Sequence, residues 1–173
     1  MVDPGILRLT PSSLAGVTTG DVPLGTEWNG HDRVGVPRTR RRTGAKALVT
    51  DGATVLLVRE RRDDGTTFWA LPGGGRHPGE SFRDCLRREV REELQCPITV
   101  SSPLGSCVYH HTTAPQTVSC YRVFAGQLEE SPTPVTDEGV AEVRWVYPES
   151  PPSETLRPFR RLLDDLADAS NGN

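Results

Sequence analysis

Residues 74–96, GGRHPGESFRDCLRREVREELQC, decide the fold, because a glycine-rich loop there leads directly into an acidic helix. Ser81 is a favourable helix N-cap, and Asp84 stands three residues later, near the capping-box pattern. Pro97 follows the segment and disfavours helical backbone in the residue before it. The sequence therefore predicts a helix over residues 81–94.

The predicted helix carries carboxylates on the side where apolar residues are expected. At about 100° per residue, Phe82 and Leu86 mark an inward stripe. Glu89 and Glu93 fall on this stripe, and Glu92 lies at its flank. Three arginines point the other way, namely Arg83, Arg87 and Arg91. An amphipathic helix normally keeps its charges outward, so the inward carboxylates need a specific explanation.

A divalent cation explains these carboxylates most simply. Buried unpaired carboxylates carry a large free-energy cost. Glu89, Glu92 and Glu93 project toward one point from adjacent turns, and their oxygens suit Mg²⁺ or Mn²⁺. The alternative is a surface helix with Glu–Arg pairs such as Arg88–Glu92, and a bare E-x-x-E-E pattern would favour that alternative.

The glycine loop before the helix favours the metal site. Gly73-Gly74-Gly75 lets the backbone approach a ligand or ion closely. The helix N-terminus nearby attracts anionic groups such as phosphate. Together with Glu80 and Arg88, this combination is far more specific than a glycine turn or an acidic run alone.

Residues 74–96 resemble the Nudix box, G-x5-E-x7-R-E-U-x-E-E-x-G-U, in which U is an apolar residue. Every charged position matches, from Glu80 through Arg88-Glu89 to Glu92-Glu93. One position departs, because Gln95 stands where the family has Gly, just past the helix, where positive φ is common. The resemblance implies an α/β fold, a Nudix-type α/β/α sandwich with a mixed β-sheet.

The resemblance also implies a metal-dependent mechanism. The implied metal ligands are the carbonyl of Gly73 and the carboxylates of Glu89, Glu92 and Glu93, with Mg²⁺ or Mn²⁺ as the cofactor. Arg88 would orient Glu89, which is a ligand or the general base, and Glu80 would brace the loop and helix. The implied activity is that of a Nudix hydrolase, which cleaves a diphosphate linkage in a nucleoside diphosphate-linked substrate by metal-assisted attack of water. The alternative is a catalytically weak Nudix-like nucleotide-binding or sensor domain.

A further catalytic carboxylate is expected outside the box, because relatives often bring one from a loop late in the domain. Asp137-Glu138-Gly139 precedes a strand predicted over 142–146. Glu138 is the residue we select, since its side chain reaches further and Gly139 frees the backbone beside it. Asp137 and Glu142 are the alternatives for this role, and an exposed acidic turn with no catalytic role is equally compatible with the sequence.

The chain is expected to contain one Nudix hydrolase domain over residues 44–168, between an irregular N-terminal extension, 1–43, and a tail, 169–173. The extension ends in a basic run, 38–42, which we interpret as a solvated linker. Asp51-Gly52 predicts a hairpin between strands at 45–50 and 53–58. Further strands are expected at 98–100, 106–109, 118–124 and 142–146, and an apolar stripe over 156–166 predicts a final helix.

The composition limits the partners. A net charge of -3 excludes a whole-chain basic surface for gripping nucleic acid. We find no secretory signal and no apolar run that would span a bilayer, so a cytoplasmic location and no membrane partner are expected. The expected partner is a small-molecule nucleotide-type substrate, and a homodimer is compatible with the sequence. The four cysteines are expected to be reduced and packed as small apolar groups.

The aromatic residues and histidines give little information on the substrate. Five aromatic residues are expected mainly in the core, where they would not be available to stack on a base: Trp69, Tyr109, Tyr121, Phe124 and Trp145. His110 and His111 are adjacent on a predicted strand, so they face opposite ways and do not bind one metal together.

Overall fold

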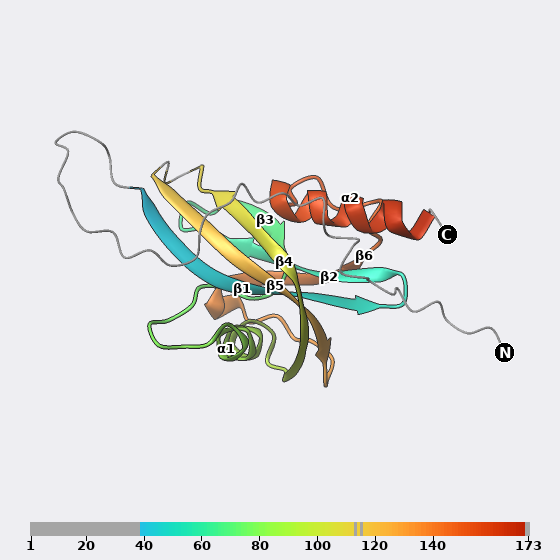
Figure 1. Ribbon diagram of the computed structural model, residues 1–173, viewed down its shortest axis with the longest axis horizontal. Coiled ribbons are helices and arrows are strands. Elements are labelled where there is room, and N and C mark those ends of the chain that lie inside the picture. The colour runs from blue at the N-terminus through green and yellow to red at the C-terminus, as the bar shows by residue number, and fades with distance from the viewer. Residues whose placement is uncertain (1–38, 113, 115, 172–173) are drawn as a thin grey trace.

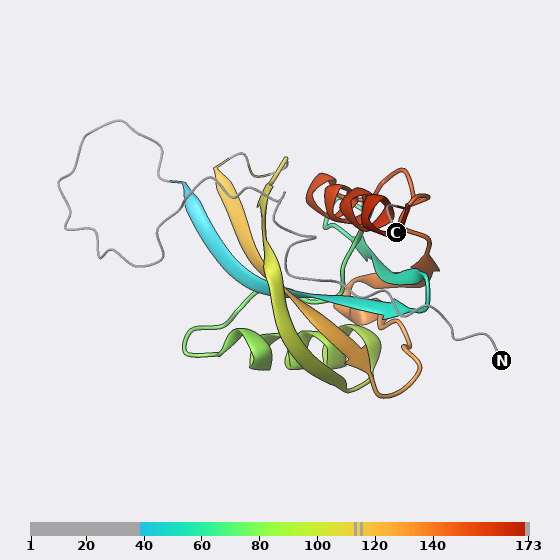
Figure 2. The same ribbon diagram turned by 45° about the vertical axis from the view of Figure 1, so that its right-hand side comes forward.

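The computed structural model describes residues 39–112, 114 and 116–171, and their elements form three layers. A mixed six-stranded sheet lies in the middle, with α1 (Phe82–Leu94) on one face and α2 (Arg157–Asn171) on the other (Figures 1 and 2). The strands are β1 (Arg40–Asp51), β2 (Thr54–Arg61), β3 (Thr67–Ala70), β4 (Ile98–His110), β5 (Thr117–Leu128) and β6 (Val140–Val146). This arrangement confirms the predicted α/β/α sandwich.

The sheet has the strand order β3-β2-β1-β5-β4, and β6 pairs with the far edge of β2. β1 and β5 run parallel, whereas the other pairs are antiparallel. β1 begins at Arg40, not after residue 43, because its parallel pairing with β5 starts at Arg40↔Thr117. The C-terminal arginines of the basic run therefore belong to a strand, which corrects the linker interpretation for residues 40–42. Residues 1–38 of the expected extension lie outside the described residues.

Two other elements are longer than the sequence predicts. β4 is one strand across both predicted segments, since shifts of register at Pro103 keep it paired with β5 through an otherwise poor strand sequence. α2 continues to Asn171, beyond the expected boundary at residue 168. In the described part of the chain, neither helix is long and apolar enough to cross a membrane.

The glycine loop can lie beside β1 because β2 separates from β1 close to the turn that joins them. These strands pair only at Thr50↔Val55 and Asp51↔Thr54, beside the predicted hairpin turn. Nearer the N-terminal end of β1, the loop takes the place of β2: the Ala45 amide donates to the Gly74 carbonyl at 3.1 Å, and the Ala47 amide donates to the Pro72 carbonyl at 2.9 Å. This loop, residues 72–76, is therefore held like a strand beside β1.

The core lies on both faces of the sheet. The inner face of α1 buries Leu86, Val90 and Leu94, and α2 buries Phe159, Leu163 and Leu166. Trp69 and Phe124 are core residues as expected, and Tyr109 and Tyr121 are partly buried. Trp145 is 38% exposed, which corrects its assignment to the core, because its side chain lies on β6 at a sheet edge. All four cysteines are free thiols, and only Cys120 is not fully buried.

The two ends of α1 follow the sequence signals. The Ser81 hydroxyl accepts a hydrogen bond from the Asp84 amide at 3.1 Å, which confirms the predicted N-cap. At the other end, Gln95 has φ 53° and ψ 24°, the left-handed conformation that a glycine would adopt without strain. Its amide still closes the last turn by donating to the Arg91 carbonyl at 3.0 Å.

We expect Gln95→Gly to stabilise the fold by about 1 kcal/mol, because glycine has no side chain to oppose this conformation. Gln95 lies outside the charged set, so turnover should change little. Equilibrium unfolding in urea measures the effect. A lower free energy of unfolding for the variant would show that the Gln95 side chain makes a stabilising contact that outweighs the strain.

Candidate active site

The inward face of α1 carries a buried carboxylate, as the helical spacing predicts. Glu93 is 7% exposed, and its Oε2 accepts a hydrogen bond from the Gly73 amide at 2.7 Å. Burial raises the pKa of Glu93 above its ordinary value, while the nearby Lys46 opposes that shift. Glu93 thus binds the backbone of the glycine loop from the α1 face of the sheet.

Lys46 is a member of this site that sequence reasoning missed. It lies on β1 and is 3% exposed, and its ammonium donates to Glu60 Oε1 at 3.1 Å and to the carbonyl of Gly73. Glu60 comes from β2, the strand that has parted from β1. A single lysine inside the apolar run 45–49 is the signal that would have drawn attention to it.

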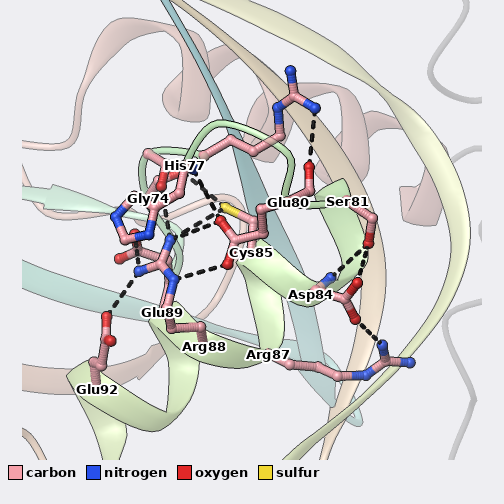
Figure 3. Close-up of polar contacts among 12 residues, drawn as sticks. Gly74, His77, Glu80, Ser81, Asp84, Cys85, Arg87, Arg88, Glu89 and Glu92 are labelled. Atoms are coloured by element: carbon pink, nitrogen blue, oxygen red, sulfur yellow. Dashed lines mark hydrogen bonds and ion pairs between the residues drawn. The ribbon is translucent and has the colours of Figure 1, made fainter.

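Arg88 links the outer carboxylates of the site (Figure 3). Its guanidinium donates to both oxygens of Glu80 at 2.9 and 3.0 Å, and to the Gly75 carbonyl at 2.9 Å. It also donates to Glu89 at 2.8 Å and to Glu92 at 2.9 Å. The Arg88–Glu92 pair of the alternative interpretation is therefore present, as one part of a larger network.

Glu89 lies directly against the glycine loop. A Cβ at position 74 would be 2.6 Å from Glu89 Cδ, so a side chain there would displace this carboxylate from its place. Glu80 binds the residue that follows the loop, because Glu80 Oε2 accepts a hydrogen bond from the His77 amide at 3.0 Å. The Arg88 hydrogen bonds are the main reason that the pKa of Glu80 falls to about 2.

The donor set fits a hard divalent cation. The site has five carboxylates and two cationic side chains, which leaves a formal excess of negative charge. The carboxylates belong to Glu60, Glu80, Glu89, Glu92 and Glu93, and the cations are Lys46 and Arg88. Among the described residues, no three His, Cys, Asp or Glu side chains converge closely enough to hold an ion in this arrangement. Arg88 instead bonds both Glu89 and Glu92, and Lys46 bonds the Gly73 carbonyl. Oxygen ligands of this kind suit Mg²⁺ or Mn²⁺.

Glu138 lies on a short 3-10 helix, Thr136–Glu138, and its side chain is exposed. The segment before it is tied to the C-terminal end of α1, since the Val135 amide donates to the Glu93 carbonyl at 2.9 Å. Asp137 is exposed on the same turn, whereas Glu142 is paired with Arg144 at 2.5 Å. The loop therefore reaches the helix end that carries Glu92 and Glu93.

A second cluster lies where β2 and β4 end and where β3 and β5 begin, and it is formed by Arg62, Phe68, Tyr109, His111 and Ser119. The Arg62 guanidinium is 4.2 Å from the centre of the Phe68 ring, and it donates to the Tyr109 hydroxyl at 3.1 Å. His111 Nε2 is 2.8 Å from Ser119 Oγ, and its ring centre is 4.7 Å from that of Tyr109. Aromatic rings and a guanidinium are thus gathered on one part of the surface.

Comparisons with known proteins agree with this geometry. The family model for the NUDIX domain matches residues 40–166. The nucleoside triphosphatase NudI of Enterobacter sp. (strain 638) is 31% identical over 133 residues, which cover 71% of this chain and 94% of NudI. The fold and site define a hydrolase of phosphorus acid anhydrides, and the chain belongs to the Nudix family.

Solved structures share the fold at lower sequence identity. The MutT protein of Methanosarcina mazei Go1 has a TM-score of 0.67 and 22% identity, covering 80% of this chain and all of its own, 100%. The MutT NUDIX hydrolase of Burkholderia pseudomallei has a TM-score of 0.61 and 22% identity, covering 73% of this chain and 98% of its own. The predicted MutT-like fold is therefore confirmed.

We expect Glu80→Gln to destabilise the metal-free protein at neutral pH and to lose that effect in acid. The folded-state pKa of Glu80 is about 2, below its ordinary value of 4.5. The carboxylate therefore adds stability above pH 4.5, and this contribution disappears as the pH falls through the folded value. Thermal melts of both proteins, from neutral pH down to about pH 2, measure the difference. A gap between the melting temperatures that is constant over this range would contradict the Glu80–Arg88 assignment.

Proposed function

We propose that the protein hydrolyses a diphosphate linkage in a nucleotide-type substrate, with Mg²⁺ or Mn²⁺ as cofactor. The observation that carries this proposal is the packing of the carboxylate face of α1 against the glycine loop, with Glu89 touching Gly74 and Glu93 bonded to Gly73. A diphosphate is densely negative, and a bound divalent cation would neutralise its oxygens and lower the pKa of the attacking water.

The residues of the Nudix box and Gly73 would have different roles in this reaction. Glu92 and Glu93 would be the principal ligands, with the Gly73 carbonyl beside them. Glu89 would be a further ligand or would take the proton of the water. Arg88 would orient Glu89, a role supported by the 2.8 Å bond between them. For an ion to reach Glu89 and Glu92, Arg88 would turn away from at least one of them.

The substrate that we favour is a nucleoside triphosphate. This choice is supported by the similarity to NudI, a nucleoside triphosphatase that is 31% identical to this chain. The cluster around Arg62 and Tyr109 supports a planar, anionic substrate, because aromatic faces and guanidinium groups bind bases and phosphates. ADP-ribose-like sugars and dinucleoside polyphosphates are the other members of the panel that tests this choice.

We expect the purified protein to hydrolyse at least one nucleoside diphosphate-linked compound in a panel of triphosphates, nucleotide sugars and dinucleoside polyphosphates. Turnover should require Mg²⁺ or Mn²⁺ and stop on addition of a chelator, because the site has an excess of carboxylates. Chromatography of the released phosphate products gives the measurement. Nucleotide binding without metal-dependent turnover on the whole panel would favour the sensor alternative.

Replacement of a ligand tests the site within that assay. Glu92→Gln and Glu93→Gln should each lower turnover by roughly 100-fold, because each removes one negative charge that would hold the cation, and the cation is what stabilises the transition state. Glu149→Gln, on an exposed loop residue, is the matched control and should retain wild-type turnover. Turnover close to wild type for either ligand variant, with its melting temperature preserved, would remove that residue from the ligand set.

Glu138 is proposed as the catalytic carboxylate outside the box. Glu138→Gln should lower turnover strongly and leave the melting temperature nearly unchanged, because the exposed turn contributes little to stability. Asp137→Asn and Glu142→Gln, assayed at saturating Mg²⁺, are the comparison variants. A larger loss in either of these would transfer the role to that residue, and full activity in all three would leave the turn without one.

A further inference from the structure

Among the residues that the structure describes, Lys46 is the buried cation of this site, and the proposed chemistry does not use it. Its ammonium lies between Glu60 and the Gly73 carbonyl, and its side chain is 4% exposed. The rings of Tyr121 and Phe159 cover it from the side of α2, with centres 5.5 and 5.9 Å from Nζ. A buried ammonium without charged partners would be strongly penalised, so its position depends on the acidic groups around it.

Two oppositely charged side chains hold the two backbone polar groups of Gly73. Its amide donates to Glu93, and its carbonyl accepts from Lys46. The φ angle of Gly73 is +116°, and a side chain there would lie 2.8 Å from Leu86 Cδ1, so no other residue fits. Lys46 and Glu93 therefore fix the direction of the Gly73 carbonyl, whose oxygen is one of the proposed metal ligands.

The Lys46 ammonium forms an ion pair with the Glu60 carboxylate at 3.1 Å. The Gly73 carbonyl consequently has a fixed positive group as its partner. A divalent cation that approaches this oxygen meets a like charge at hydrogen-bond distance, which opposes its binding.

We propose that Lys46 is a positioning residue that presets the Gly73 carbonyl and competes with the divalent cation for it, so that metal affinity is lowered in exchange for a preformed loop. This role rests on the proposed metal site. It differs from a merely structural role in the direction of its effect. A residue that only supports the fold would weaken metal binding when removed, whereas a competitor strengthens it.

Mn²⁺ titration of the metal-free protein, with free Mn²⁺ followed by electron paramagnetic resonance, tests the proposal without any substrate. Lys46→Met should bind Mn²⁺ about tenfold more tightly than wild type, and should melt at a lower temperature without metal.

Lys46→Gln loses the charge but keeps a hydrogen-bond donor, so it should also bind Mn²⁺ more tightly. It replaces Lys46→Met in the test if that variant does not fold. Lys46→Arg should bind like wild type. Glu60→Gln should bind more weakly, because Lys46 then loses its counter-charge.

Arg61→Gln is the matched control, since it removes one positive charge from an exposed position on the same strand as Glu60. Its Mn²⁺ affinity should match wild type. Equal tightening in Arg61→Gln and Lys46→Met would assign the effect to net charge and overturn the proposal, as would unchanged or weaker binding in both Lys46→Met and Lys46→Gln. Wild-type protein that binds no Mn²⁺ would instead overturn the proposed metal site, and this role with it.

Discussion

The burial of Glu93 beneath the glycine loop is the constraint on which the rest of the structure depends. A buried carboxylate must have hydrogen-bond donors and nearby positive charge. The Gly73 amide and Lys46 provide these only if the loop lies beside β1. That position is open because β2 leaves β1 after two residue pairs. One arrangement, the buried Glu93 beneath the glycine loop, therefore depends on three features. These are the separation of β1 from β2, the glycines of the loop and the direction of α1.

The site has an inner and an outer part, each with its own cation. Lys46 balances the buried Glu93 and the partly buried Glu60, while Arg88 balances Glu80, Glu89 and Glu92. The two cations differ in how easily they can move. Arg88 lies near the surface with its side chain 23% exposed, whereas Lys46 is enclosed by rings and strands. Arg88 is thus the group that an arriving ion can displace, and Lys46 is the fixed one.

Local signals allowed the helix and its surroundings to be predicted from the sequence. The cap at Ser81, the inward face and the unusual conformation of Gln95 each depend on a few neighbouring residues, and the structure has all three. Contacts between distant segments were missed. The start of β1 at Arg40 depends on pairing with β5, and the Lys46–Glu60 pair joins two strands that are not hydrogen-bonded there. A single sequence shows neither the strand that pairs with residues 40–42 nor the carboxylate that pairs with Lys46. The lysine was therefore assigned to an ordinary strand without a role.

A crystal structure of the Mn²⁺-soaked protein, with the ion located by its anomalous scattering, tests most directly whether the carboxylates of α1 hold a metal ion. We expect a peak bounded by the carboxylates of Glu89, Glu92 and Glu93, with Arg88 turned away from at least one of its two helix partners. Manganese bound elsewhere, with Arg88 still bridging Glu89 and Glu92 as in Figure 3, would contradict it.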